Sequence, residues 1–257
     1  MFKFVVDSDI HFDLREGGKV KPWSYKVAAH KRMFDAMDAD KTIELVIMAG
    51  DLCEHGASGR KYRGEKADEL GGLKAHVATI EARETGAVDA KYKHVKTLLC
   101  VGNHDTWTAP PLPVPAWIWW KNLRSLPLDL GNGVIYKRDH RGLTMMVLGI
   151  CPNAIVLPLL SLWLKCAKNP VLLVFHYNLQ GPYSNFWTDI EKKNFLKTIL
   201  PHKGKIAGIV VGHHHMTGEL EWEGFKVIMG AGETLPLCEF DPRASKARDS
   251  IKVVDYI

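Results

Sequence analysis

The sequence predicts an α/β fold, and three observations support this. Short runs of β-branched and aliphatic residues alternate with longer segments of helical apolar spacing. The main apolar runs each end in glycine or polar residues, which is typical of strands that open onto a site at their carboxyl ends. The length of 257 residues and the 46% hydrophobic content suit one large domain, residues 1–257, with a sizeable core.

The apolar runs place the strands. Buried strands are expected over residues 2–6, 45–49, 97–101, 145–150, 171–175 and 206–211, with closing strands over 225–229 and 250–257. The apolar region 143–164 is broken by Gly149, Pro152 and Pro158, so it predicts a strand followed by a helix and not a membrane span.

The helices follow from apolar spacing and capping residues. A helix is predicted over 24–39 with Ser24 as its N-cap, and another over 66–83. Thr188 and Glu191 form a capping box that opens a further helix. The buried side of that helix is expected to come from residues 186, 187, 190, 195 and 199.

Residues 107–130 are rich in tryptophan and proline. The prolines predict a long loop inserted beside the site, with a short helix over 117–123, because proline interrupts helices and central strands. Two interpretations stay open for the tryptophans. They either pack onto the core or form a flap that contacts an apolar or aromatic part of a substrate.

Composition limits the location and the partners. The five cysteines are odd in number and widely spaced, which predicts a reduced chain with buried thiols. The first residues lack the layout of a signal peptide, so we expect a cytoplasmic protein without a transmembrane segment. The net charge of +5 suits an anionic substrate, and no clear nucleic-acid-binding motif is present.

Histidine pairs and acid–histidine pairs predict metal ligands. In an extended chain, residues two apart face the same side, so His213 and His215 can converge while His214 faces elsewhere. The alternative is a solvated polar turn. Asp9 and His11 repeat the spacing after the first strand. Asp7 shares their parity but lies deeper in the strand, and we assign it a structural role.

Taken in order, the polar clusters closely resemble the calcineurin-like metallophosphoesterase superfamily. The matching pieces are Asp9-x-His11, Gly50-Asp51, Gly102-Asn103-His104-Asp105, His176 and Gly212-His213-x-His215. The resemblance implies a sandwich of two mixed β-sheets flanked by helices, with the site at the strand ends.

The resemblance also implies a role for each of these residues. One metal ion would be bound by Asp9, His11, Asp51 and His215. The second would be bound by Asp51, Asn103, His176 and His213, so that Asp51 bridges the two ions. His104 would lie beside the leaving group, with Asp105 orienting it.

Imidazole and carboxylate ligands favour Mn, Fe or Zn. Two such ions about 3.5–4 Å apart activate a bridging hydroxide for in-line attack on phosphorus and hold the phosphate oxygens. A protonated His104 would stabilise the charge that develops on the departing oxygen. The expected function is therefore dinuclear-metal-dependent hydrolysis of a small or medium phosphomonoester or phosphodiester.

Several alternatives stay open. A nuclease would need a continuous basic track, which the scattered Lys and Arg residues do not establish. Trp117, Trp119 and Trp120 would suit a lipid-linked phosphoester or pyrophosphate. A non-catalytic scaffold that retains the fold is the alternative from another class of protein, and the complete set of matching residues argues against it.

Overall fold

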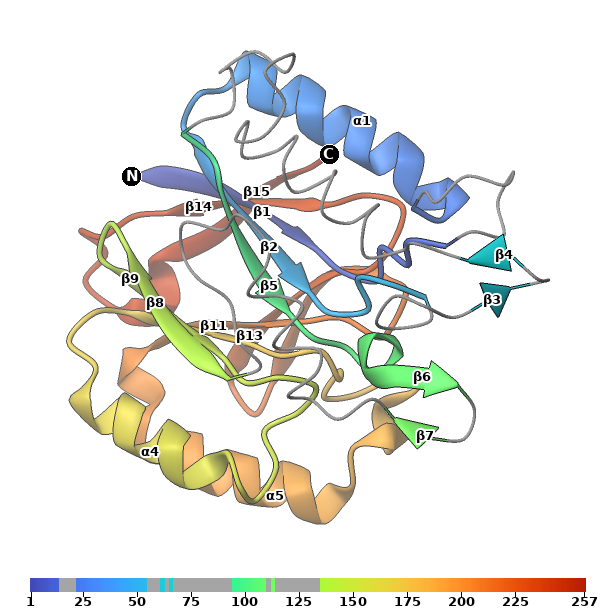
Figure 1. Ribbon diagram of the computed structural model, residues 1–257. Coiled ribbons are helices and arrows are strands. Elements are labelled where there is room, and N and C mark those ends of the chain that lie inside the picture. Colours follow the sequence, from blue (N-terminus) through green and yellow to red (C-terminus); the bar gives the residue numbers. More distant parts are fainter. Residues whose placement is uncertain (14–21, 55–60, 63–64, 67–93, 110–111, 114–134) are drawn as a thin grey trace.

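The computed structural model describes residues 1–13, 22–54, 61–62, 65–66, 94–109, 112–113 and 135–257 (Figure 1). Lys66, the first residue of the helix predicted over 66–83, lies in a short strand. The rest of that helix, the short helix over 117–123 and most of the Trp/Pro-rich segment 107–130 lie outside the described residues. Two short antiparallel ladders are described at their borders. One joins β3 (Lys61–Tyr62) to β4 (Glu65–Lys66), and the other joins β6 (Trp107–Ala109) to β7 (Leu112–Pro113).

The first large sheet has five strands in the order β15-β14-β1-β2-β5. Its parallel strands are β1 (Phe2–Asp7), β2 (Ile43–Ala49) and β5 (Lys96–Cys100). Two antiparallel strands, β14 (Pro236–Phe240) and β15 (Ile251–Tyr256), complete the other edge. The sheet is therefore mixed, as expected.

The second large sheet has six strands in the order β12-β13-β11-β10-β9-β8. Its parallel strands are β9 (Leu143–Val147), β10 (Val171–Val174), β11 (Ile206–Val211) and β13 (Phe225–Gly230). The edges are antiparallel strands, β8 (Tyr136–His140) and β12 (Thr217–Trp222). The sequence patterns missed both edge strands and β14. The edge strands alternate between charged and partly buried residues, so they lack a long apolar run.

Helices cover the outer face of each sheet, which gives four layers (Figure 1). The helix α1 (Ser24–Ala39) packs on the first sheet through Ala29, Met33 and Met37. The second sheet is covered by α4 (Leu157–Cys166) and α5 (Asp189–Ile199). Short 3-10 helices are present at His104–Thr106, Ser184–Phe186, Leu200–Lys205 and Ala247–Asp249. The predicted sandwich of two mixed sheets flanked by helices is confirmed.

The period-2 side-chain alternation of the strands builds the core. Phe4 and Val6 of β1 face the second sheet, while Val5 between them faces α1. On the second sheet, Val210 faces the first sheet and Ile209 faces the helices. Both faces of the central strands are thus buried, which explains why their sequences are continuous apolar runs.

Three local predictions about helix ends and thiols require correction. The helix α1 includes Ser24, and the residue at its N-cap is Trp23, which makes no side-chain capping bond. The capping box of Thr188 and Glu191 is confirmed, but Phe186 and Ile190 are 57% and 73% exposed, so they do not belong to the buried side of α5. The five cysteines, all among the described residues, form no disulfide, and Cys166 is exposed on α4, unlike the buried thiols we expected.

Among the described residues, no helix combines the length and the apolar character that a membrane crossing needs.

Candidate dinuclear metal centre

The carboxyl ends of five strands from both sheets carry the predicted site residues. Asp9 and His11 follow β1, Asp51 follows β2, and Asn103 follows β5, all in the first sheet. The second sheet contributes His176 after β10 and the two histidines, His213 and His215, after β11. The site therefore lies where the carboxyl ends of the two sheets meet.

Left-handed backbone conformations aim most of these side chains. The φ angles are 55° at Asp9, 48° at His11, 49° at Asp51, 66° at His213 and 51° at His215. The extended chain that we expected at these positions is therefore not observed. Asp9 and His11 still converge, whereas His213 and His215 belong to different clusters of potential metal ligands. Positive φ values are uncommon outside glycine, Asp and His are among the enriched exceptions, and such strain concentrates at functional sites.

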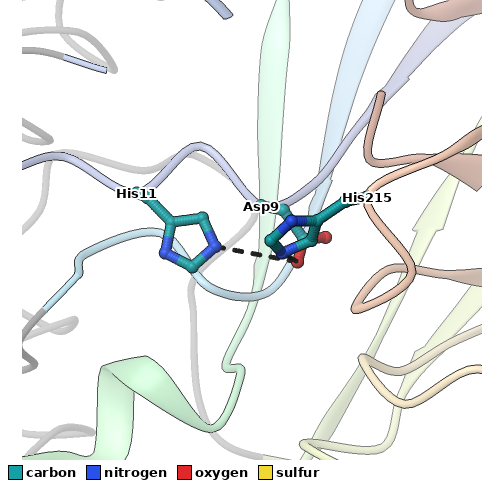
Figure 2. Close-up of side chains that lie close together, drawn as sticks. All are labelled: Asp9, His11 and His215. Carbon is teal, nitrogen blue, oxygen red and sulfur yellow. Dashed lines mark ion pairs between the residues drawn. The ribbon is translucent and has the colours of Figure 1, made fainter. Parts of the chain in front are cut away.

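The first donor group combines Asp9, His11 and His215, whose ligand atoms all lie within 4.8 Å of one another. Oδ1 of Asp9 lies 3.8 Å from Nε2 of His11 and 3.3 Å from Nε2 of His215 (Figure 2). The other oxygen of Asp9 accepts hydrogen bonds from the Ser8 hydroxyl at 2.6 Å and the His213 amide at 2.8 Å. The carboxylate is thus held by Oδ2 and presents Oδ1 to the two imidazoles.

The second donor group combines Asp51, His176 and His213, again within 4.8 Å of one another. Nδ1 of His176 lies 2.9 Å from the Ala49 carbonyl oxygen, so Nδ1 carries a proton and Nε2 is the ring atom that faces the site. In the neutral imidazole, Nε2 offers its lone pair there. That Nε2 atom is 3.1 Å from Oδ1 of Asn103 and 3.1 Å from Oδ2 of Asp51. Three atoms that can each donate an electron pair therefore converge.

Asp51 lies between the two groups. Its Oδ2 atom is 3.1 Å from Nε2 of His176 and 3.8 Å from Nε2 of His11. Its Oδ1 atom accepts a hydrogen bond from the His104 amide at 2.8 Å, which fixes the carboxylate. One oxygen thus faces both groups, as a bridging ligand requires.

Buried atoms without hydrogen-bond partners test whether the residues fit metal ions. Among the described residues, Oδ1 of Asp9, Nε2 of His11 and Nε2 of His213 have no hydrogen-bond partner, although each is buried. Buried polar atoms in native proteins are almost always bonded. Coordination to a metal ion would satisfy all three, and the oxygen and nitrogen donors suit Mn, Fe or Zn.

The charges of the site favour a bound cation. Burial lowers the pKa of His11, but the neighbouring carboxylates of Asp9 and Glu54 outweigh it and raise the pKa to about 10. Burial and the neighbouring His176 lower the pKa of His213 to about 4, so this imidazole is neutral, as a metal ligand must be. The carboxylates that attract a proton to His11 would equally attract a divalent ion.

Glu54 was not predicted from the sequence. Its Oε2 atom lies 2.7 Å from Nδ1 of His11, on the opposite side of the ring from the donor group. Such a carboxylate fixes the orientation of a metal-binding imidazole and makes it more basic. Glu54 follows Asp51 by three residues, and neither strand nor helix spacing in the sequence indicated that it turns back toward His11.

His104 and Asp105 have other partners than those expected. Nδ1 of His104 lies 2.9 Å from the Glu54 carbonyl oxygen, and the side chain is 33% exposed at the site. Asp105 accepts hydrogen bonds from the backbone amides of Leu52, Cys53 and Gly102 at 2.7–2.9 Å. It therefore fixes the loop that carries Asp51. Burial and the Asp51 charge raise the pKa of Asp105 to about 7.

Trp23 was also missed. The Trp23 ring stacks on the His11 ring, with centroids 4.0 Å apart and 10° between the planes. The centroid of the His215 ring lies 5.5 Å from that of Trp23. The Tyr25 hydroxyl donates to the Asp9 carbonyl at 3.2 Å. The start of α1 thus forms one wall of the site. Nothing in the sequence spacing indicated this, because the contact depends on how α1 crosses the first sheet.

Two further residues lie outside the donor groups. His214 is buried against Gly181, where an added Cβ would lie 2.7 Å from the His214 Cε1 atom. Asp7 pairs with Lys26 and His30 of α1, each at 2.8 Å. His214 is therefore a member of neither donor group, and Asp7 has the structural role that we expected.

Glycines permit the close approach of these loops. A Cβ atom on Gly212 would lie 1.8 Å from the Ser8 hydroxyl, and one on Gly50 would lie 2.6 Å from Nδ1 of His176. Such contacts are far inside van der Waals distance, so glycine is needed where the loops of the two sheets meet.

Comparison with known proteins agrees with this arrangement. The sequence matches the model of the calcineurin-like phosphoesterase family over residues 2–239. The chain belongs to the calcineurin-like phosphoesterase family. No curated protein matches the sequence significantly.

Similar solved structures include GAP50, described as the anchor in the inner membrane complex of Plasmodium. It aligns with a TM-score of 0.58 and 9% identity, covering 100% of this chain and 87% of GAP50. A dimetal phosphatase from Danio rerio aligns with a TM-score of 0.52 and 12% identity, covering 92% of each chain. A 5′-nucleotidase from Candida albicans aligns with a TM-score of 0.50 and 13% identity, covering 98% of this chain but 50% of the nucleotidase. At these identities the likeness concerns the fold.

Proposed function

We propose that this protein hydrolyses a phosphoester with two divalent metal ions. The observation that carries the proposal is the set of buried donor atoms without partners, on Asp9, His11 and His213, beside a carboxylate of Asp51 that faces both donor groups. Membership of the calcineurin-like phosphoesterase family supports the same class of reaction.

The proposed ligands are those expected from the sequence. Asp9, His11 and His215 would hold one ion, Asn103, His176 and His213 would hold the other, and Asp51 would bridge them. Mn, Fe and Zn are the candidate metals for this donor set. Two such ions would supply Lewis acidity that activates water and holds the phosphate oxygens.

The side chains contribute positioning and proton transfer. Glu54 holds His11 by its Nδ1 atom, and the Ala49 carbonyl holds His176 in the same way, so both rings keep Nε2 directed to the site. His104 is the partly exposed imidazole at its edge, and its Nδ1 atom is fixed by the Glu54 carbonyl oxygen. Its Nε2 atom would donate a proton to the departing oxygen of the ester.

The test compares p-nitrophenyl phosphate with bis-p-nitrophenyl phosphate after chelation and reconstitution with Mn²⁺, with metal content measured on the same samples. We expect two ions per chain and turnover of at least one substrate. The ratio of the two rates separates a phosphatase from a phosphodiesterase. Absence of bound metal would contradict the proposal, and two bound ions without turnover of any phosphoester would favour a non-catalytic scaffold.

A further inference from the structure

Aromatic rings lie beside the proposed site on the segment that follows β10. Phe186 is 57% exposed and Tyr183 is 56% exposed. Their ring centroids lie 4.9 and 6.1 Å from the ring of His213. Tyr177 is half-buried between them and the strand end, 4.6 Å from His213 and 5.9 Å from Phe186. We refer to Tyr177, Tyr183 and Phe186 as the aromatic shelf.

The shelf is held in place by its own segment. The Asn178 side-chain amide donates to the carbonyl oxygens of Gln180 and Pro182 at 3.0 and 2.8 Å. Tyr183 has a φ of 61°, a left-handed conformation that is rare for a bulky residue and costs free energy. The Phe186 amide then donates to the Tyr183 carbonyl at 3.3 Å, which closes a tight turn between the two rings.

A buried aromatic anchor follows the turn. Trp187 is 1% exposed, and its ring packs 5.5 Å from Phe175 and 5.3 Å from Phe195 in the core under α5. The capping box of Thr188 fixes the next residue as the start of α5. The segment therefore has fixed points on both sides of Tyr183 and Phe186, and yet it leaves these two rings in solvent.

Exposure of single apolar side chains is ordinary, and Leu200 at the other end of α5 is an example at 51%. The shelf differs because its rings contact a proposed metal ligand and its backbone is strained to present them. A phosphate held at the donor groups would bring the group attached to it close to these rings. Aromatic rings attract other planar rings by about 0.5–1.5 kcal/mol beyond the contribution of buried area.

We propose that the aromatic shelf binds a planar aromatic group of the substrate. The preferred substrates are then phosphoesters whose alcohol carries an aryl ring or a base, in place of a purely aliphatic group. The inference rests on the proposed function, since it assumes that the phosphate is held by the neighbouring donor groups.

The test uses two phosphomonoesters with similar primary alcohols as leaving groups, benzyl phosphate and cyclohexylmethyl phosphate. The ratio of their kcat/KM values cancels any change in metal content, because both depend on the same ions. We expect the wild-type protein to prefer benzyl phosphate. Phe186→Leu and Tyr183→Asn should each lower this preference by roughly 2- to 10-fold, and the asparagine keeps the left-handed backbone accessible.

Leu200→Ala is the matched control, because it removes an exposed apolar side chain far along the chain from the shelf. It should leave the ratio unchanged. A ratio that is the same in the wild type, Phe186→Leu and Tyr183→Asn would overturn the inference while the proposed hydrolysis stands.

Equilibrium binding keeps the inference testable without turnover. Benzylphosphonate and cyclohexylmethylphosphonate retain the phosphorus oxyanions but have no ester bond to break. We expect the Kd ratio to favour the benzyl compound in the wild type and to fall in the two shelf variants. Equal Kd values in all proteins would overturn the inference by itself. Discrimination in binding, with no hydrolysis of any ester, would instead contradict only the proposed function.

Discussion

Nδ1 of His11 lies 2.7 Å from the Glu54 carboxylate, and Nε2 of the same ring faces Asp9 and Asp51. Glu54 therefore holds the imidazole in the tautomer that a metal ion needs. We expect Glu54→Ala to weaken metal affinity by about 10- to 100-fold, as loss of such partners typically does. Glu54→Gln should weaken it less, because the amide oxygen still accepts from Nδ1. Competition with a chelating dye measures both affinities, and equal affinities in all three proteins would rule out this role.

Asp51 is the proposed bridge between the ions. Asp51→Asn removes the charge from the oxygen that faces both donor groups, so we expect loss of both metals and of hydrolysis. Elemental analysis after dialysis provides the measurement. The exposed Asp255→Asn is the control for a changed carboxylate and should keep both ions. Retention of two ions and of the wild-type rate in Asp51→Asn would contradict the bridge.

His104 is proposed to act on the departing oxygen. His104→Ala should keep both metal ions, because its ring belongs to neither of the two proposed ligand sets. Its kcat should fall by about 10²- to 10⁴-fold with an alkyl phosphate and much less with p-nitrophenyl phosphate, whose leaving group needs no proton. An equal effect on both substrates would show that the imidazole acts in another way.

The adjacent histidines should respond differently to truncation. His213→Ala removes a proposed ligand and should lower the metal content by one ion. His214→Ala should keep both ions, since its ring packs against Gly181, and it should lower stability by about 1–3 kcal/mol by leaving a cavity. Metal content and urea unfolding of the metal-free proteins measure the two effects separately. Loss of metal in His214→Ala would show that this ring, too, reaches the site.

The buried pair of Lys26 and Asp7 makes a prediction about the fold alone. Lys26 is fully buried, and its Nζ atom lies 2.8 Å from Asp7 and 2.8 Å from the Gly230 carbonyl oxygen. Lys26→Met leaves a buried carboxylate with one partner fewer, so we expect a loss of about 3 kcal/mol of unfolding free energy. Lys31→Met, on the exposed face of the same helix, should change it little. Denaturant unfolding of the two variants is the comparison, and similar midpoints would contradict the assignment.

The sequence predicted the layers and most of the central strands, because strands buried on both faces are continuous apolar runs. It did not predict β8, β12 and β14. In β8 and β12 exposed residues alternate with partly buried ones, and their charged residues resemble those of loops. Such strands are defined by the neighbour that they pair with, and a single sequence does not show that neighbour.

The candidate site shows the same division. Asp9, His11 and Asp51 stand out because each lies shortly after the end of an apolar run. Glu54, Trp23 and the amide partners of Asp105 were not predicted, since they reach the site through turns and through the crossing of α1 over the sheet. The left-handed angles at Asp9 and His213 were not predicted either, because an extended chain was the simplest geometry that brings alternate residues together.

The proposed ligands come from both halves of the sandwich. Asp51 belongs to the first sheet and His176 to the second, while their atoms are only 3.1 Å apart. Metal ions bound between them would link the two sheets at their interface. A small displacement of one sheet relative to the other would disrupt the metal coordination before any strand pairing was lost. The catalytic rate would therefore depend on the relative position of the two sheets. Val6→Ala or Val210→Ala, at the interface between the sheets, should slow hydrolysis at temperatures where the fold is intact.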